Sequence, residues 1–243
     1  MVRGDFEKSW HARYENWASK YKDDHLIAGW SAEGLSRRLA LVLSLIKDLS
    51  LKPGSLVLDL GAGAGTYTRA ISNIGHTCLG LDYSKRVIEA AKEKGKGEHY
   101  IQGEAYNLPF RANVFDAVVC IGVLQSLKDP EYALGEMQRV LMPGGHLFLD
   151  GLSRIFWLHR FRSWKEALNG ENARMNYVNP YRLRRGAESM GFSDGKLYWL
   201  GVTKLSPEWI VDSKGFVPFL FAHLAGHAFL LYERKSSLEE LPA

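Results

Sequence analysis

The stretch VLDLGAGAGTYT, residues 57–68, constrains the fold of this chain more than any other segment. An apolar run that contains Asp59 leads directly into glycines at positions 61, 63 and 65, and a helical pattern follows. Glycine tolerates positive φ and has no Cβ, so such a loop lets a ligand approach backbone N–H groups and a helix N-terminus. The segment therefore predicts a buried strand, a ligand-binding turn and a helix.

Strand-like and helical segments alternate through the middle of the chain. We expect helices at 66–75, 85–95 and 129–145. The expected strands are SLVLDLG, HTCLGLDYS, EHYIQGEA, FDAVVCIGVL and HLFLDGL. Alternation in units of this length implies an α/β fold with a mostly parallel sheet and helices on both faces.

The chain has no internal repeat and no low-complexity linker, so we expect its residues 1–243 to form a single domain. Residues 1–52 are interpreted as an N-terminal helical cap that stops at Lys52-Pro53-Gly54. Residues 53–150 form the expected cofactor-binding core, 151–185 a substrate lid and helix, and 186–243 the C-terminal strands. Additions to such folds tend to lie over the carboxyl edge of the sheet, where ligands bind.

The composition is that of an ordinary globular protein, with 46% hydrophobic and 24% charged residues and a formal charge of +4. Cys78 and Cys120 both lie in apolar runs and are interpreted as core residues, which fits a cytoplasmic protein. The N-terminus has no signal-peptide core, and no His, Cys or acidic cluster has metal-ligand spacing. The apolar run Phe216–Leu231 is shorter than the roughly 20 residues of a membrane span. We therefore expect no transmembrane segment and no metal, and contact of this run with lipid stays open.

An acidic residue at the end of the second strand indicates which ligand the glycine loop serves. Asp82 stands where a carboxylate can accept hydrogen bonds from both hydroxyls of a ribose. The spacing G-x-G-x-G departs from the G-x-G-x-x-G of nicotinamide-binding folds, and Asp59 would repel a pyrophosphate. These features favour S-adenosylmethionine, which has a ribose and an amino group but no phosphate. Asp59 has a second interpretation as an acceptor for loop N–H groups, and both can hold.

Taken together, these segments resemble the class I S-adenosylmethionine-dependent methyltransferases, especially the small-molecule branch that includes ubiquinone and menaquinone biosynthesis enzymes. The resemblance runs continuously over residues 57–149, through VLDLGAGAGTYT, GLDYS, GEAYNLPF and the segment FDAVVC to HLFL. It implies a Rossmann-like, seven-stranded sheet whose last strand is antiparallel. KLYWLGVT and HAFLLYERK would be strands six and seven, and NPYRLRRGAESMGF the helix before them.

The resemblance also implies a set of cofactor-binding residues. Asp59 would lie near the amino group of the cofactor, Asp82 would bind the ribose, and Glu104 stands where the family usually has aspartate against the adenine. In YENWASKY, Tyr21 matches a tyrosine that closes over the methionine end, with a plain core tyrosine as the alternative. The full set is Tyr21, Asp59, Gly61, Ala62, Gly63, Asp82, Tyr83, Glu104, Ala105, Ile121 and Gly122.

Methyl transfer from a sulfonium is an in-line displacement that leaves S-adenosylhomocysteine, and it needs positioning more than a catalytic side chain. Relatives often read V-L-H-H after the fourth strand, whereas this chain has Gln125 and Ser126, which can orient a substrate but cannot act as a base. The catalytic residue is therefore left unassigned. His11, His25 and His159 are interpreted as surface or packing residues.

Substrate choice is expected to depend on residues 153–185, which are rich in arginine and aromatic residues. As a lid, this segment would offer Trp157 and Arg160 to the substrate. As a plain amphipathic helix, it would pack Phe156, Trp157, Phe161 and Trp164 inward.

We therefore expect a methyltransferase for a small-molecule acceptor, with no DNA partner. Two alternatives stay open: an RNA methyltransferase, against which stands the absence of an N/D-P-P-Y/F motif, and a non-catalytic cofactor-binding partner subunit. A nicotinamide-dependent dehydrogenase is disfavoured by the glycine spacing. The sequence identifies neither the acceptor atom nor the oligomeric state.

Overall fold

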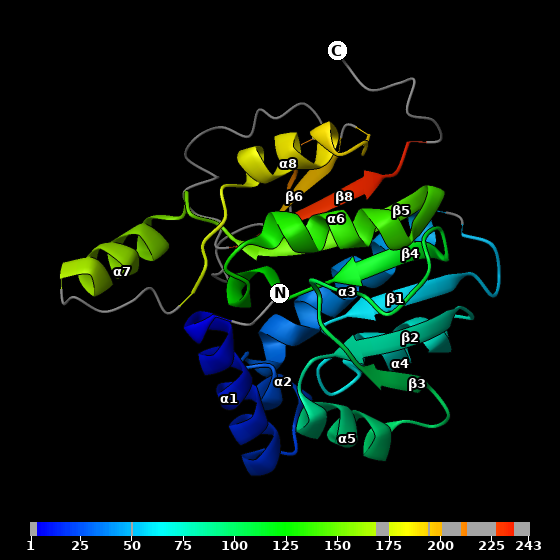
Figure 1. Cartoon of the computed structure of the whole chain (residues 1–243), viewed down its shortest axis with the longest axis horizontal. Helices are drawn as coiled ribbons and strands as arrows, with labels where there is room; N and C mark the ends of the chain where they lie inside the picture. The colour runs from blue at the N-terminus through cyan, green and yellow to red at the C-terminus, as the bar shows by residue number, and fades with distance from the viewer. Residues whose placement is uncertain are drawn as a thin grey trace.

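The computed structural model describes residues 4–49, 51–168, 175–193, 195–200, 210–212 and 227–235. Its centre is an eight-stranded sheet with the order β3-β2-β1-β4-β5-β8-β6-β7 (Figure 1). The strands are β1 Leu56–Leu60, β2 Thr77–Asp82, β3 His99–Gln102, β4 Phe115–Cys120, β5 Leu141–Leu152, β6 Lys196–Leu200, β7 Ile210–Asp212 and β8 His227–Glu233. The first five strands pair in parallel, and β8 is antiparallel to both β5 and β6.

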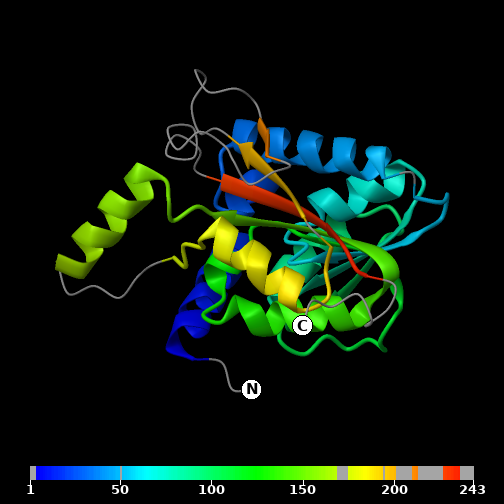
Figure 2. The same cartoon turned by 90° about the horizontal axis from the view of Figure 1, so that it is seen from above.

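Helices cover both faces of this sheet, and one side of it carries α3 and α4 while the other carries α6 and α8 (Figure 2). The helices are α1 Asp5–Lys20, α2 Asp24–Ile27, α3 Ala32–Asp48, α4 Thr66–Asn73, α5 Lys85–Lys94, α6 Pro130–Val140, α7 Trp157–Leu168 and α8 Pro180–Ser189, with a short 3-10 helix η1 at Leu124–Ser126. α5 packs against β2, β3 and α1.

The alternation of side chains along β1 separates the two halves of the core. Leu58 and Leu60 pack in the cluster that includes α6 and α8, whereas Val57 packs in the cluster with α3 and α4. Because successive side chains of a strand point to opposite faces, Asp59 shares the α4 side with Val57. This register decides where the Asp59 carboxylate lies.

Local sequence explains why several helices begin where they do. Ser31 and Ser84 each accept a hydrogen bond from the backbone N–H three residues later, at Gly34 and Val87. Asn179 accepts from two N–H groups at the start of α8. Side-chain oxygens at this position satisfy donors that have no partner within the helix.

The predicted fold class is confirmed, with two differences in detail. The sheet has one short strand, β7, beyond the seven that were expected. The segment LMPGG was expected to end a helix in a turn, but it begins β5. Leu141 pairs with Phe115 across a register shift, and the Gly144 N–H donates to the Arg234 carbonyl. Pairing with both neighbours thus extends this glycine-rich segment.

Some expectations fall outside the described residues, including the end of KLYWLGVT and the part of Phe216–Leu231 before β8. Within the described ranges, the helices are too short or too polar to cross a membrane. The division of the chain into cap, core, lid and C-terminal strands stays a prediction.

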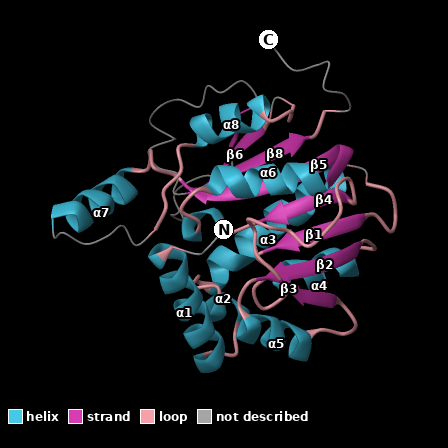
Figure 3. Ribbon diagram, viewed as in Figure 1, coloured by secondary structure: helices cyan, strands magenta, loops and turns pink. Residues whose placement is uncertain are grey.

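Figure 3 shows α1 and α2 beside the carboxyl ends of β1 and β2, which is the edge expected for a ligand.

Candidate functional site

Two adjoining pockets open at the carboxyl edge of the parallel strands. They have empty volumes of about 480 Å³ and about 670 Å³. Both are lined by the same five residues from the ends of β1, β2 and β4, namely Gly61, Asp82, Tyr83, Val123 and Ser126. The two pockets are therefore halves of one elongated site.

The glycine loop forms the wall that the two halves share. Gly61, Gly63 and Gly65 all have positive φ, at 77°, 55° and 84°. A Cβ on Gly61 would lie 2.2 Å from Cγ2 of Val123, so the loop and the segment after β4 approach at a distance that only glycine permits. The backbone N–H of Gly61 donates to the Leu81 carbonyl at 2.7 Å, which ties the loop to β2.

Asp82 lies at the junction of the two pockets, as the sequence predicted for a ligand-binding acid. Its Oδ2 accepts a hydrogen bond from the Gly63 N–H at 3.0 Å, and its Oδ1 accepts from the Ser84 N–H at 2.9 Å. Burial raises the pKa of Asp82 to about 6, although these backbone N–H groups oppose the shift. The carboxylate is thus held in one orientation and is poorly solvated.

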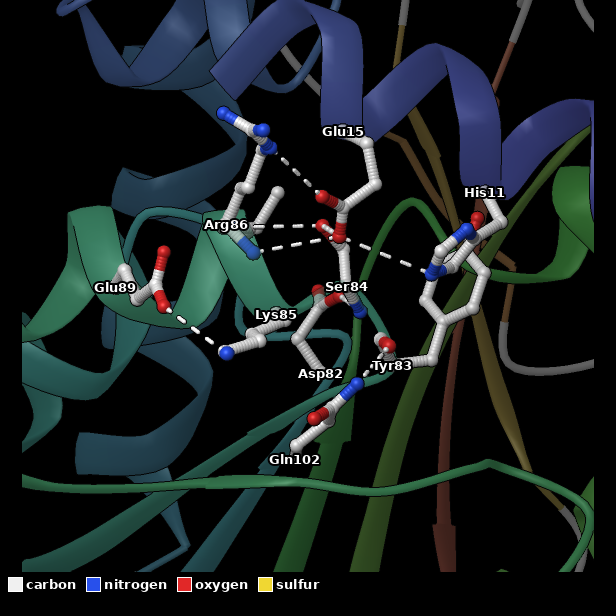
Figure 4. Close-up of polar contacts among 10 residues, drawn as sticks. His11, Glu15, Asp82, Tyr83, Ser84, Lys85, Arg86, Glu89 and Gln102 are labelled. Carbon is white, nitrogen blue, oxygen red and sulfur yellow. Dashed lines mark hydrogen bonds and ion pairs between the residues drawn. The ribbon is translucent and has the colours of Figure 1, made fainter. Parts of the chain in front are cut away.

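The N-terminal helix holds the segment that follows Asp82 (Figure 4). Glu15 of α1 accepts hydrogen bonds from the Ser84 hydroxyl at 2.8 Å and from the Arg86 N–H at 3.3 Å. His11, one turn earlier, lies edge-on to the Tyr83 ring at a centroid distance of 5.1 Å. These contacts fix Tyr83 between the helix and the pocket.

Asp59 does not line either pocket. Its side chain is buried on the α4 side of the sheet and accepts a hydrogen bond from the Thr68 hydroxyl at 2.6 Å. Burial raises the pKa of Asp59 to about 7. Of the two interpretations of this residue, the observed contacts support a buried acceptor within the strand–loop–helix unit. Its partners are the hydroxyl and the backbone N–H of Thr68 on α4 rather than a loop N–H.

The smaller pocket ends in a group of acidic and aromatic residues. Glu104 and Ala105, both predicted, line it beside Tyr106. Glu7 of α1 also lines it and was not predicted. Its Oε1 accepts from the Lys128 N–H at 3.1 Å and from the Tyr106 hydroxyl at 3.3 Å, whereas its buried Oε2 has no hydrogen-bond partner. Glu7 thus ties α1 to the segment after η1 and contributes to the wall of this pocket.

The larger pocket contains most of the remaining predicted residues, including Ala62, Gly63, Ile121 and Gly122. Tyr21 is not in its lining and packs instead against the small cluster around Ile27. Three aromatic residues that were not predicted, Tyr14, Trp30 and Tyr67, line it. The only hint in the sequence was the aromatic spacing of Trp10, Tyr14 and Trp17 along α1. The assignment of Tyr21 stays a prediction without support from the pocket geometry.

The predicted substrate residues are not all in the same place. Ser126 lines both pockets, whereas its neighbour Gln125 in η1 is buried and lines neither. Trp157 and Arg160 lie on α7 and are exposed. The inward packing considered for this helix holds only for Phe156, since Trp157, Phe161 and Trp164 are all more than half exposed.

The charge of the pocket walls limits the ligands that the site can bind. Within the described part of the chain, the lining residues include four acids, Glu7, Asp24, Asp82 and Glu104, and no lysine or arginine. Asp24 is paired with Arg69 and Lys94. A site with this lining suits a neutral or cationic ligand better than a pyrophosphate.

Comparisons with known proteins agree with this arrangement. Residues 58–149 match the family model described as "Methyltransferase domain". A demethylmenaquinone methyltransferase of Staphylococcus haemolyticus is 36% identical over 141 residues, which are 56% of this chain and 57% of that protein. A mouse protein named "Probable tRNA methyltransferase 9B" is 37% identical over 142 residues, or 57% of this chain and 28% of that one. This chain therefore spans little more than half of the first relative and a smaller part of the second.

Solved structures share the fold over almost the full length. A SAM-dependent methyltransferase of Thermotoga maritima has a TM-score of 0.65 at 22% identity and covers 92% of this chain and 99% of its own. Magnesium protoporphyrin IX methyltransferase of Synechocystis, solved with bound SAH, also has a TM-score of 0.65, at 16% identity, covering 95% of this chain and 100% of its own. Residues 58–149 are thus similar to a methyltransferase domain, and the chain shares its fold with solved S-adenosylmethionine-dependent methyltransferases.

Proposed function

We propose that this protein binds S-adenosylmethionine in the two adjoining pockets and transfers its methyl group to a small-molecule acceptor. The observation that carries the proposal is the Asp82 carboxylate, which the Gly63 and Ser84 N–H groups hold at the junction of the two pockets. Among the described residues, the lining of these pockets includes no lysine or arginine. A nucleoside with a cationic tail and no phosphate matches this combination of charge and shape.

The residues present fit the parts of this cofactor. Asp82 would accept the ribose hydroxyls. The smaller pocket would take the adenine, with Glu104 as an acceptor for its amino group and Glu7 in the same wall. The larger pocket would take the amino-acid end, beside Gly61 and Gly63, which line it.

The bound cofactor would supply an activated methyl group on a positively charged sulfur. The protein has to orient the acceptor and keep water out. Ser126 lines both pockets and can orient an acceptor by hydrogen bonding. Burial raises the pKa of Tyr14 far above neutrality, so its hydroxyl keeps its proton and can donate a hydrogen bond but cannot act as a base. We assign no general base.

A small molecule is the acceptor that we favour, because the site is enclosed by α1, α2 and the segment after β4. The demethylmenaquinone methyltransferase relative supports a small organic acceptor. The tRNA methyltransferase 9B relative supports RNA as a second candidate. We also propose a cytoplasmic location and no DNA partner, with a non-catalytic cofactor-binding role as the third candidate.

Calorimetric titration and a transfer assay test the proposal. S-adenosylmethionine and S-adenosylhomocysteine should bind with one site per chain, and NADH should not bind. Methyl transfer from labelled cofactor should then be measured with a quinol panel and with bulk tRNA as separate acceptors. Binding of NADH without binding of S-adenosylmethionine or S-adenosylhomocysteine would falsify the cofactor assignment. Transfer to tRNA alone would replace the small-molecule acceptor with RNA.

Cofactor affinity should depend on pH through Asp82. Its pKa is raised to about 6, and only the ionised form accepts hydrogen bonds from the ligand with both oxygens. Titration of S-adenosylhomocysteine should show a plateau above pH 6 and a loss approaching tenfold per pH unit below it. An Asp82→Ala variant should lose this pH dependence, and a profile identical to wild type in that variant would contradict the assignment.

The same pKa shift gives the opposite trend for the stability of the ligand-free protein. A carboxyl whose pKa is raised by folding keeps its proton in the native state after the unfolded chain has lost it. The contribution of Asp82 to the free energy of unfolding should therefore fall as the pH rises from about 4 to about 6. The contribution of Asp59 should fall as the pH rises from about 4 to about 7. Urea unfolding across this range separates the effect on stability from the effect on binding.

A further inference from the structure

Helix α7 extends away from the body of the protein and carries large exposed apolar side chains. Figures 1 and 2 both show it projecting beyond the sheet on the side of the strands' carboxyl ends. Trp157, Phe161, Trp164 and Leu168 are 53%, 56%, 59% and 66% exposed. A contiguous apolar surface of this kind on a globular protein marks an interaction site.

The sequence gathers these residues on one face of the helix. Trp157, Phe161, Trp164 and Leu168 follow the spacing i, i+4, i+7 and i+11, so they form a single stripe, called here the α7 stripe. At 100° per residue, Arg160 and Lys165 come to opposite edges of the stripe, and both are exposed.

The base of the helix is attached to the protein through its other face. His159 Nδ1 lies 2.9 Å from the Ser153 carbonyl oxygen, and the His159 ring packs against Phe156 and Tyr177 at centroid distances of 4.8 Å. This attachment orients the helix so that the α7 stripe faces away from its own anchor.

We propose that the α7 stripe docks α7 on the surface of an anionic lipid bilayer. Tryptophan, phenylalanine and leucine flanked by basic side chains are typical of helices that lie in the membrane interface. Arg160 and Lys165 are placed to bury their aliphatic stems at the boundary while their charges reach lipid phosphates. A helix of 12 residues is too short to span the membrane, so it lies on the surface.

Docking in this orientation bears on the acceptor. α7 follows β5 and leaves the body of the protein at the same edge of the sheet where the pockets open. An apolar acceptor held in the bilayer would therefore reach the site from the docked side. This consequence rests on the proposed function, whereas docking itself does not.

Flotation with vesicles tests the docking. The full chain should float with vesicles of phosphatidylcholine and phosphatidylglycerol, and much less with phosphatidylcholine alone. A Phe161→Ala/Trp164→Ala/Leu168→Ala variant should lose vesicle affinity by at least about a hundredfold, because three apolar side chains no longer enter the interface. A Lys165→Glu variant should lose at least about fivefold on anionic vesicles only. Tyr132→Ala, which removes an aromatic ring that is 60% exposed on α6, serves as the matched control and should float like wild type.

Parallel measurements show whether a partner other than a bilayer covers the α7 stripe. Binding of S-adenosylhomocysteine by each variant shows that it is folded. If the wild type does not float, or if the triple variant floats equally well, the docking proposal is wrong. Concentration-dependent dimers that the triple variant abolishes, without flotation of the wild type, would assign the stripe to a second copy of the chain. Failure of the wild type to bind the cofactor would count against the proposed function and would leave the flotation result unaffected.

Discussion

Replacement of Asp82 by alanine should weaken the binding of S-adenosylhomocysteine by about 2–4 kcal/mol, the sum of two hydrogen bonds to a charged acceptor. The carboxylate lies at the end of β2, where the Gly63 and Ser84 N–H groups hold both of its oxygens in place. Its loss removes the proposed ribose acceptors and also frees the glycine loop. Isothermal titration calorimetry at pH 7.5, above the raised pKa of about 6, measures the full effect.

Asp116→Ala provides the control for this experiment. Asp116 lies at the opposite, amino edge of the sheet, where its Oδ2 accepts a hydrogen bond from the Leu56 N–H at 2.8 Å. Its removal takes away a partly buried carboxylate with a backbone partner, so it should reduce stability without changing cofactor affinity. If both variants lose affinity equally, the effect of Asp82 is structural. If Asp82→Ala binds like wild type, the ribose assignment is wrong.

The sequence was sufficient to predict the parallel half of the fold, because each of its elements carries local signals. The apolar strand β1 ends directly before Gly61 and β2 ends at Asp82. Of the helices that follow, α4 begins after Gly65 and α5 at the Ser84 cap. The second half of β5, HLFLDGL, was predicted as a strand, whereas its first five residues could not be predicted in the same way. Its first residues are Leu141, Met142, Pro143 and two glycines, a composition typical of a turn, and they become a strand through pairing with β4 and β8.

The part of the site that comes from adjacent motifs was predictable, whereas the part contributed by the N-terminal helices was not. Gly61, Asp82 and Glu104 follow strands whose ends must meet at one edge. Glu7 and Trp30 reach the same pockets because α1 and α2 pack over that edge, which no local pattern specifies. Asp59 was placed near the ligand by its distance from the glycines along the sequence, but the alternation of β1 turns it towards α4.

Replacement of Asp150 by alanine should destabilise the protein by about 3–5 kcal/mol, the typical cost of removing one partner of a buried ion pair. Asp150 is fully buried in β5. Its Oδ1 accepts a hydrogen bond from the Gly122 N–H at 2.6 Å, and its Oδ2 lies 3.9 Å from Nε of Arg38 on α3. The Arg38 guanidinium is 4.5 Å from the centroid of the Trp30 ring, and a Cβ on Gly122 would meet that ring at 2.3 Å. One carboxylate thus supports both the loop after β4 and the tryptophan of the larger pocket.

Urea unfolding of single and double variants separates these contributions. Arg38→Met alone leaves the Asp150 charge without its partner, whereas Arg38→Met/Asp150→Leu removes both charges and keeps most of the volume. The double variant should therefore lose less free energy of unfolding than the single variants Arg38→Met and Asp150→Leu lose together. The reason is that replacing a buried pair by apolar residues is often close to neutral. Asp48→Ala, an exposed carboxylate on α3, should change stability by no more than about 0.5 kcal/mol. The double variant should still bind S-adenosylhomocysteine more weakly, because the Gly122 N–H has lost its acceptor beside the pocket. Additive costs of the two substitutions would show that the charges act independently and that Arg38 stabilises Trp30 by packing alone.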